Sequence, residues 1–232
     1  KILLAGMALP GPYSFKKGRI QLMTGVAGWD EIDIKMQMEE QFQIPALIEQ
    51  DANCGALAQF WYTDIPMQDE LLVYIAVGQG IGAGIISNGE IVHGAIGAAG
   101  EIGHTTINFN GPKCSCGNTG CLETYCSANA LEQAAGLPIK EFFPLLREES
   151  YPQAMQIWED YLNHLAFAMR NLNLIIDAPI IISGYLAPYF TEEDIAKLAE
   201  RINSSTPFTV DPTQILVGTH GQYTPAIGAA LY

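Results

Sequence analysis

The sequence predicts an α/β fold, in which strands and helices alternate along the chain. Short apolar runs end at glycine or proline, as strands commonly do. Between these runs, apolar residues recur every three or four positions, which is the spacing of one helix face. Hydrophobic residues make up 49% of the 232 residues and charged residues only 16%, so a sizeable core is expected. Alternation of this kind is typical of a sheet covered by helices.

The first quarter of the chain predicts two strands, each followed by a helix. The apolar run at 2–9 ends at Pro10-Gly11-Pro12, which indicates a strand and then a loop. In the segment 33–42, the residues Ile34, Met38 and Phe42 share one helix face. A strand at 44–48 then precedes a helix of small residues at 52–61, and Asp51 stands at its N-terminus, where a carboxylate is favoured.

The rest of the chain repeats the alternation. A buried strand at 71–77 leads into glycines at every second position from 78 to 84, and a second strand is expected from Ile85. Asn88-Gly89 indicates a hairpin turn into a strand at 90–92. The remaining expected elements are helices at 127–135, 157–172, 192–203 and 225–231, and strands at 175–183 and 215–217.

The best candidate boundary lies in the loop at 62–70, which divides the chain into lobes at 1–65 and 66–232. The first lobe looks incomplete. The chain opens directly in a strand-like segment without an initiator Met, so the sequence reads as a fragment truncated at its N-terminus.

Composition and charge restrict the function. The formal net charge of −14 argues against a broad basic face that would grip nucleic acid, and any DNA binding would need a further N-terminal domain. No apolar run is long enough for a transmembrane helix, so no membrane contact is expected. An odd count of five cysteines fits a reducing, cytoplasmic compartment better than a disulfide scaffold.

A zinc site is predicted between residues 100 and 123. One histidine and three cysteines form the pattern H-x9-C-x-C-x4-C: His104, Cys114, Cys116 and Cys121. Thiolates and a neutral imidazole suit a closed tetrahedral site, and Gly117 and Gly120 allow a tight fold around an ion. Buried free cysteines or a disulfide are the alternatives. Cys54 and Cys126 fit no ligand position and are expected in the core.

Several other residues could carry chemistry or serve structure alone. Asp51 could take a proton from a hydroxyl in a cleft, or it could simply cap a helix. The residues Glu101 and His104 lie three apart, so that both could face one pocket. Glu101 and Glu123 could accept hydrogen bonds from vicinal hydroxyls, or contact the zinc ligands. The glycines at 78–84 could face phosphate oxygens, or they could serve tight turns. The segment does not have the pattern of a Walker loop.

These motifs together resemble the signature of the ROK family of repressors, uncharacterised reading frames and sugar kinases. The resemblance is carried by the glycine segment 78–85, Gly94, the segment 100–104, the cysteines with residues 120–124, Pro10-Gly11-Pro12, Gly25-x-x-Gly28-Trp29 and Asp51-Ala52-Asn53. It covers nearly the whole chain. It implies an actin-like ATPase (ribonuclease H-like) fold of two lobes, the first incomplete here, with the zinc loop in the second and the terminal helix packing back toward the first.

The resemblance also implies site roles, position by position. Asp51 matches the catalytic base. The positions matching the sugar site are Gly11, Gln50, Asp51, Glu101, His104 and Glu123. The positions matching the nucleotide site are Gly78, Gly80 and Gly184. His104 would then bind zinc through one ring nitrogen and face the sugar with the other.

Two functions follow from the resemblance. The first is the sugar-sensing part of a transcriptional regulator of the xylose- or N-acetylglucosamine-repressor type, in which sugar binding changes DNA affinity. The second is an ATP-dependent hexose kinase, with Mg²⁺ and Asp51 as base. The regulator is slightly favoured because Gln50 replaces the usual Asn of the kinases and Tyr185 would crowd an adenine. A zinc-stapled domain without either activity is the third possibility. The resemblance also implies a homodimer or homotetramer.

Overall fold

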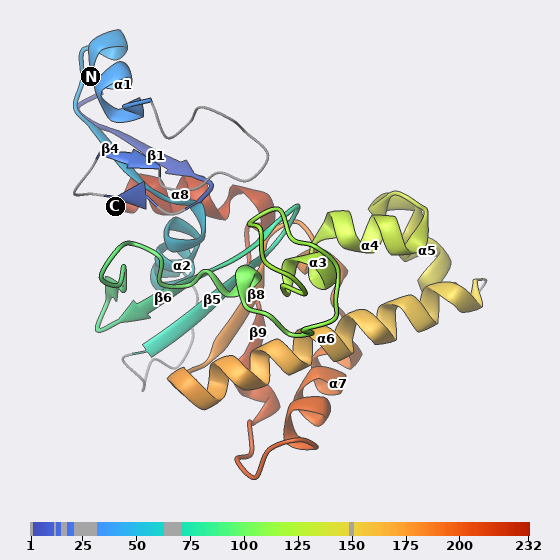
Figure 1. Cartoon of the computed structure of the whole chain (residues 1–232). Coiled ribbons are helices and arrows are strands. Elements are labelled where there is room, and N and C mark those ends of the chain that lie inside the picture. Colours follow the sequence, from blue (N-terminus) through green and yellow to red (C-terminus); the bar gives the residue numbers. More distant parts are fainter. Residues whose placement is uncertain (1, 12, 15–17, 21–31, 63–70, 149–150) are drawn as a thin grey trace.

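A computed structural model describes residues 2–11, 13–14, 18–20, 32–62, 71–148 and 151–232 (Figure 1). Its centre is a five-stranded sheet with strand order β7-β6-β5-β8-β9. The strands are β5 (Leu71–Val77), β6 (Ile81–Ser87), β7 (Glu90–Ile91), β8 (Ile180–Ser183) and β9 (Ile215–Val217). Strands β5, β8 and β9 run parallel, whereas β6 pairs antiparallel with both β5 and β7.

One face of this sheet carries the main core. Val73, Ile75 and Val77 alternate along β5 toward this face, as the two-residue period of a strand requires. They pack with the buried face of α6 (Pro152–Ile176), which crosses the sheet in Figure 1. The same core includes residues of α3 (Glu123–Cys126), α4 (Ala128–Ala135), α5 (Ile139–Arg147) and α7 (Glu192–Asn203). This face therefore supports the segment that contains the cysteines.

The other face of the sheet packs against α2 (Asp51–Tyr62), which in turn contacts α8 (Thr224–Leu231). The two helices approach closely because Gly228 has no side chain: a Cβ there would lie 1.7 Å from the carbonyl oxygen of Cys54. α8 also contacts β1 (Ala5–Leu9), and Figure 1 shows both helices between the central sheet and the β1–β4 pair. The C-terminal helix thus lies beside the first strands of the chain.

The N-terminal part contains small strand pairs. β1 pairs in parallel with β4 (Ala46–Gln50), and β2 (Tyr13–Ser14) pairs antiparallel with β3 (Arg19–Ile20). Helix α1 (Ile34–Phe42) begins at Asp33, whose side chain accepts a hydrogen bond from the Met36 amide. The expected boundary loop falls mostly at 63–70, outside the described residues, so the division into two lobes stays a prediction.

Many expected elements are confirmed. The helix at 192–203 and the strands at 71–77 and 215–217 have the expected bounds, and Asn88-Gly89 forms the hairpin turn, both with positive φ. Cys54 and Cys126 are fully buried in the core. Within the described part of the chain, no helix is both long enough and apolar enough to cross a membrane.

The expected start of the second strand at Ile85 is wrong, because β6 already begins at Ile81. Gly82 and Gly84 lie inside the strand, where they make room for α2. A Cβ at Gly84 would lie 2.4 Å from the carbonyl oxygen of Ala52. These glycines therefore serve a close approach of helix to sheet rather than a loop.

The expected strand at 175–183 is also wrong in its first half. Helix α6 continues to Ile176 and ends at Asp177, which adopts a left-handed conformation (φ 47°). Ile175 is 82% exposed at the end of this helix, so its β-branched side chain, a type favoured in strands, is not part of a buried strand. Helices α3 and α5 and the pair β2–β3 were not expected. Other elements differ from the prediction only in their bounds. The strands predicted at 2–9 and 44–48 correspond to β1 and β4, and the helix predicted at 52–61 is α2, which already begins at Asp51.

Candidate functional site

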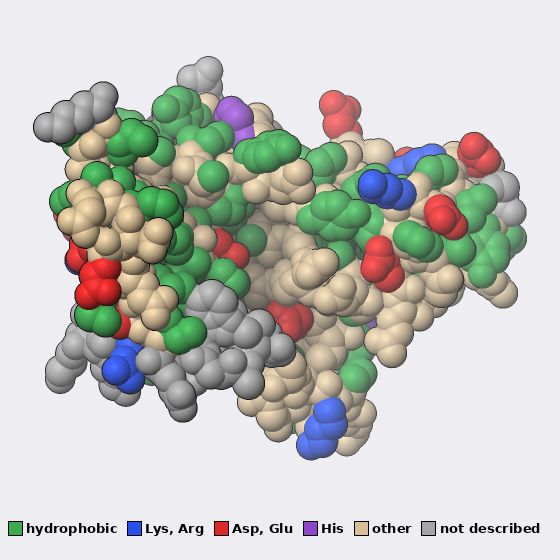
Figure 2. Space-filling model, turned by 90° about the horizontal axis from the view of Figure 1, so that it is seen from above, with side chains coloured by type: hydrophobic (Ala, Val, Ile, Leu, Met, Phe, Trp, Pro, Cys, Tyr) green, Lys and Arg blue, Asp and Glu red, His purple; other side chains and the backbone are tan. Residues whose placement is uncertain are grey.

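A cavity of about 630 Å³ lies where β4 and α2 meet the glycine turn and the cysteine segment. Figure 2, which views the molecule from above, shows a hollow with acidic side chains inside it. All nine residues predicted for sugar and nucleotide line the cavity: Gly11, Gln50, Asp51, Gly78, Gly80, Glu101, His104, Glu123 and Gly184. They come from distant parts of the sequence. The structure thus brings the predicted residues together, while their individual roles stay predictions.

Asp51 lies at the junction between β4 and α2. Its Oδ1 accepts a hydrogen bond from the Ala52 amide at 2.7 Å, as expected of a carboxylate at a helix N-terminus. Burial and, to a smaller extent, the negative charge of Glu101 together raise the pKa of Asp51 to about 6. Asp51 is therefore mostly ionised at neutral pH, yet can take up a proton within the physiological range.

Glu101 is held from two sides. The Gln50 Nε2 donates to Glu101 Oε1 at 2.6 Å, and His104 Nε2 lies 3.8 Å from Glu101 Oε2. Burial raises the pKa of Glu101, which the hydrogen bond from Gln50 partly offsets. Gln50 Oε1 is buried and forms no hydrogen bond with any of the described residues. A ligand hydroxyl could satisfy this acceptor, because a buried acceptor without a partner is costly.

Glu123 stands at the start of α3, against the glycine turn. Its Oε2 accepts a hydrogen bond from the Ile81 amide at 3.0 Å and would lie 2.8 Å from a Cβ at Gly80. The turn itself closes through Gly78 N–H to Gly80 O at 3.0 Å. Gly80 therefore permits the close contact between the turn and the carboxylate.

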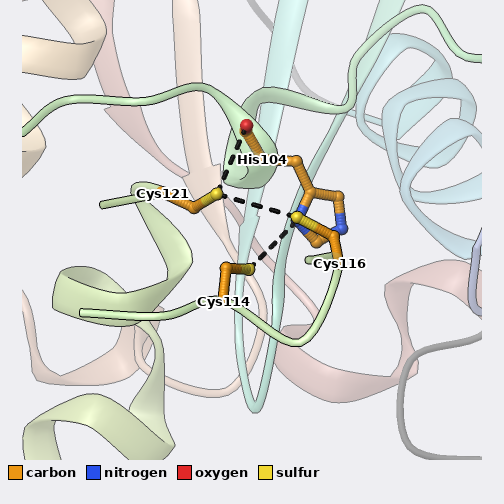
Figure 3. A group of neighbouring side chains, drawn as sticks. All are labelled: His104, Cys114, Cys116 and Cys121. Carbon is orange, nitrogen blue, oxygen red and sulfur yellow. Dashed lines mark hydrogen bonds between the residues drawn. The ribbon is translucent and has the colours of Figure 1, made fainter. Parts of the chain in front are cut away.

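The predicted zinc ligands form one cluster (Figure 3). One ligand atom from each of His104, Cys114, Cys116 and Cys121 lies within 4.8 Å of all the others. The Sγ atoms of Cys116 and Cys121 are 3.8 Å apart, and Cys114 Sγ lies 3.7 Å from His104 Nδ1. Ligands about 2.3 Å from a tetrahedral zinc would be separated by roughly 3.8 Å, so the donor set and its spacing fit this ion.

His104 joins this cluster to the cavity. Its Nδ1 faces Cys114, and its Nε2 faces Glu101. An ion bound at Nδ1 would fix the ring and leave Nε2 directed at the cavity. The arrangement therefore suits the double role expected for this histidine.

Some lining residues were not expected from the sequence. Tyr74 lies on β5 beneath the cavity, Asn129 donates to the Gln79 carbonyl at 3.1 Å, and Gln222 lies in the turn before α8. No motif marks them. Tyr185, which the family resemblance implies to be near an adenine site, is 37% exposed and is absent from the described residues that line this cavity.

Comparisons with known proteins agree on one family. A model of the ROK family matches residues 1–232. The chain is 32% identical over 221 residues to a xylose repressor from Caldicellulosiruptor bescii, and the aligned region covers 87% of this chain and 55% of the repressor. It is also 32% identical over 218 residues to a glucokinase from Halalkalibacterium halodurans, covering 92% of this chain and 60% of the kinase. The crystal structure of a ROK hexokinase from Thermus thermophilus superimposes with a TM-score of 0.82 and 28% identity, over 97% of this chain and 76% of the other. The chain therefore spans little more than half the length of these two curated relatives.

Proposed function

The chain belongs to the ROK family, and from this premise we propose that it is a sugar-binding domain, the effector-sensing part of a sugar-responsive transcriptional regulator. The carboxylates of Asp51, Glu101 and Glu123 line one cavity, and this single observation supports sugar binding best. Carboxylates that are already fixed by hydrogen bonds accept further bonds from vicinal hydroxyls without loss of side-chain freedom. A polyhydroxylated ligand is the chemistry that this cavity suits.

In this proposal each polar group has a distinct task. Glu101 and Glu123 accept hydrogen bonds from sugar hydroxyls, and the free acceptor of Gln50 takes another. Zinc, held by His104, Cys114, Cys116 and Cys121, would supply a rigid brace for the wall that contains His104. The backbone of Gly11 closes the cavity from the side of β1. DNA contact would come from a segment outside residues 1–232, because the chain carries a net charge of −14.

The relatives suggest which sugars to test. Repressors and kinases among them are named for xylose, glucose and N-acetyl-D-glucosamine, so the panel comprises these three sugars in their D forms. Isothermal titration calorimetry of the chain with this panel should detect binding of at least one sugar. The variant Glu101→Ala should bind it at least tenfold more weakly, because two acceptor oxygens are lost. Glu159→Gln, which removes a carboxylate on α6 that pairs with Lys197, is the control and should leave affinity unchanged.

A second candidate function is ATP-dependent phosphorylation of a hexose, and the raised pKa of Asp51 is the observation that favours it. As base, Asp51 would accept the proton of the sugar hydroxyl as this oxygen attacks a phosphoryl group. In this alternative Gly78, Gly80 and Gly184, which line the same cavity, would face the nucleotide. Mg-ATP, when bound, would supply the phosphoryl group.

One pair of assays separates the two functions in the full-length protein. Sugar-dependent release of DNA without ADP formation supports the regulator. Sugar-dependent ADP formation that Asp51→Asn abolishes supports the kinase. Absence of binding to any sugar of the panel would refute the proposal for both.

A further inference from the structure

Glu49 is a buried carboxylate to which none of the roles above gives a purpose. Only 2% of its surface is exposed, and it lies on β4, directly before Gln50 and Asp51 in the chain. Unlike its two neighbours, it is absent from the described residues that line the cavity. A buried charge is costly unless it is paired and hydrogen-bonded, so its surroundings indicate what it stabilises.

The donors to Glu49 come from separate segments of the chain. Its Oε1 accepts from the Gln50 amide at 2.7 Å and from Asn53 Nδ2 at 2.9 Å. Its Oε2 lies 2.6 Å from His93 Nε2. Burial and the nearby negative charge of Glu49 raise the pKa of Tyr232, at the end of the chain, to about 12. Glu49 thus links β4 and α2 to the segment after β7.

His93 stands at the base of the loop that leads to Glu101. Its carbonyl oxygen accepts from the Ala99 amide at 3.2 Å and so closes the loop. After Ala99, the carbonyl oxygen of Gly100 accepts a hydrogen bond from the Ala83 amide at 2.8 Å, and Gly100 adopts φ +87°. A Cβ at Gly100 would lie 1.9 Å from the Ala83 carbonyl oxygen, so the loop is pressed onto β6. Glu101 follows directly, and its position depends on this anchored loop.

We propose that Glu49 and His93 are positioning residues for the sugar site: their hydrogen bond behind the cavity fixes Glu101 relative to Asp51. The contact complements the one between Gln50 and Glu101 at the cavity itself. At the end of β4, the Glu49–His93 contact therefore lies behind the cavity and the Gln50–Glu101 contact lies at the cavity itself. The inference rests on sugar binding as proposed above, and neither Glu49 nor His93 touches the ligand in it.

The test compares two replacements of His93 by calorimetry with the sugar that the wild-type chain binds. His93→Gln keeps an N–H donor that can reach Glu49, whereas His93→Leu has similar volume and no donor. The affinity of His93→Leu should fall about tenfold, and that of His93→Gln should stay within about threefold of wild type. Circular dichroism and thermal unfolding report whether each variant is folded. Glu159→Gln again serves as the control.

A second variant covers the case in which His93→Leu does not fold. Glu49→Gln keeps an acceptor for Gln50 and Asn53 but loses the charge facing His93, and we expect severalfold weaker binding. Wild-type affinity in every folded variant would overturn the inference and leave the proposed function standing, as would equal losses in His93→Leu and His93→Gln. A wild-type chain that binds no sugar would refute the proposed function, and this inference with it.

Discussion

Replacing Asp51 with Asn should make the sugar-free protein more stable at neutral pH. The folded protein raises the pKa of this carboxyl from 3.8 to about 6, chiefly by burial and then by the charge of Glu101. The ionised form is therefore less stable in the folded chain than in the unfolded chain. A neutral amide of nearly the same shape removes that cost.

The magnitude follows from the shift. About two pKa units correspond to roughly 3 kcal/mol at a pH above both values. Asp51 keeps some contact with solvent, and Asn loses the ionic hydrogen bond from Ala52, so we expect a net gain of about 1–2 kcal/mol. For a chain of this size, the gain raises the melting temperature by roughly 2–8 °C.

The sign of the pH dependence distinguishes this cause from others. Because the folded pKa is the higher one, Asp51 destabilises the fold increasingly as pH rises from about 4 through about 6. At pH 4.0 the folded state is protonated and the unfolded state is only about half ionised, so most of the advantage of Asp51→Asn should vanish there. Urea-induced unfolding followed by tryptophan fluorescence at pH 7.5 and pH 4.0 measures both limits.

The control is Asp160→Asn on the exposed side of α6, where the free energy of unfolding should change by no more than about 0.5 kcal/mol. Two results would refute the reasoning. One is an Asp51→Asn variant no more stable than wild type at pH 7.5. The other is a gain of equal size at both pH values, which would point to packing rather than charge.

Three further predictions concern the site and its supporting loop. Lowering the pH from 7.5 to 5.0 should weaken sugar binding about tenfold by calorimetry, since the ionised fraction of Asp51 falls by about that factor; an affinity independent of pH would contradict this. Purified wild-type chain should contain close to one zinc per chain by elemental analysis, and Cys116→Ser should lose both the zinc and sugar affinity. A wild-type chain that contains no metal and still binds sugar with full affinity would contradict the bracing role of zinc. Gly120→Ala should unfold the zinc loop, because its Cβ would lie 1.6 Å from a carbonyl oxygen. Gly136→Ala has nearly the same φ but open space around its Cβ, and it should lower the free energy of unfolding by only about 1 kcal/mol. Equal thermal shifts in the two variants would contradict the steric explanation.

The sequence was most informative where local chemistry determines structure. The histidine and three cysteines could be predicted as one cluster because their types and spacing suit a single ion, and the structure brings them within 4.8 Å. The strand at 71–77 and the helix at 192–203 could be predicted from periodicity alone. The residues of the cavity came from the family resemblance, since nothing in the local sequence joins Asp51 to Glu101.

The sequence was least informative where tertiary packing decides. Gly82 and Gly84 indicate a loop by composition, but they belong to a strand because α2 lies against them. Ile175 indicates a strand by propensity, but the helix that contains it continues because its other face packs on the sheet. The Glu49–His93 contact joins residues 44 positions apart, and no spacing rule predicts it.

The most direct test of the account is a crystal structure of the chain with the sugar that binds it most tightly. We expect the sugar in the cavity of about 630 Å³, with hydroxyls within about 3 Å of the carboxylates of Glu101 and Glu123 and one hydroxyl facing Asp51. A sugar bound elsewhere, or bound in the cavity without contact to these carboxylates, would contradict it.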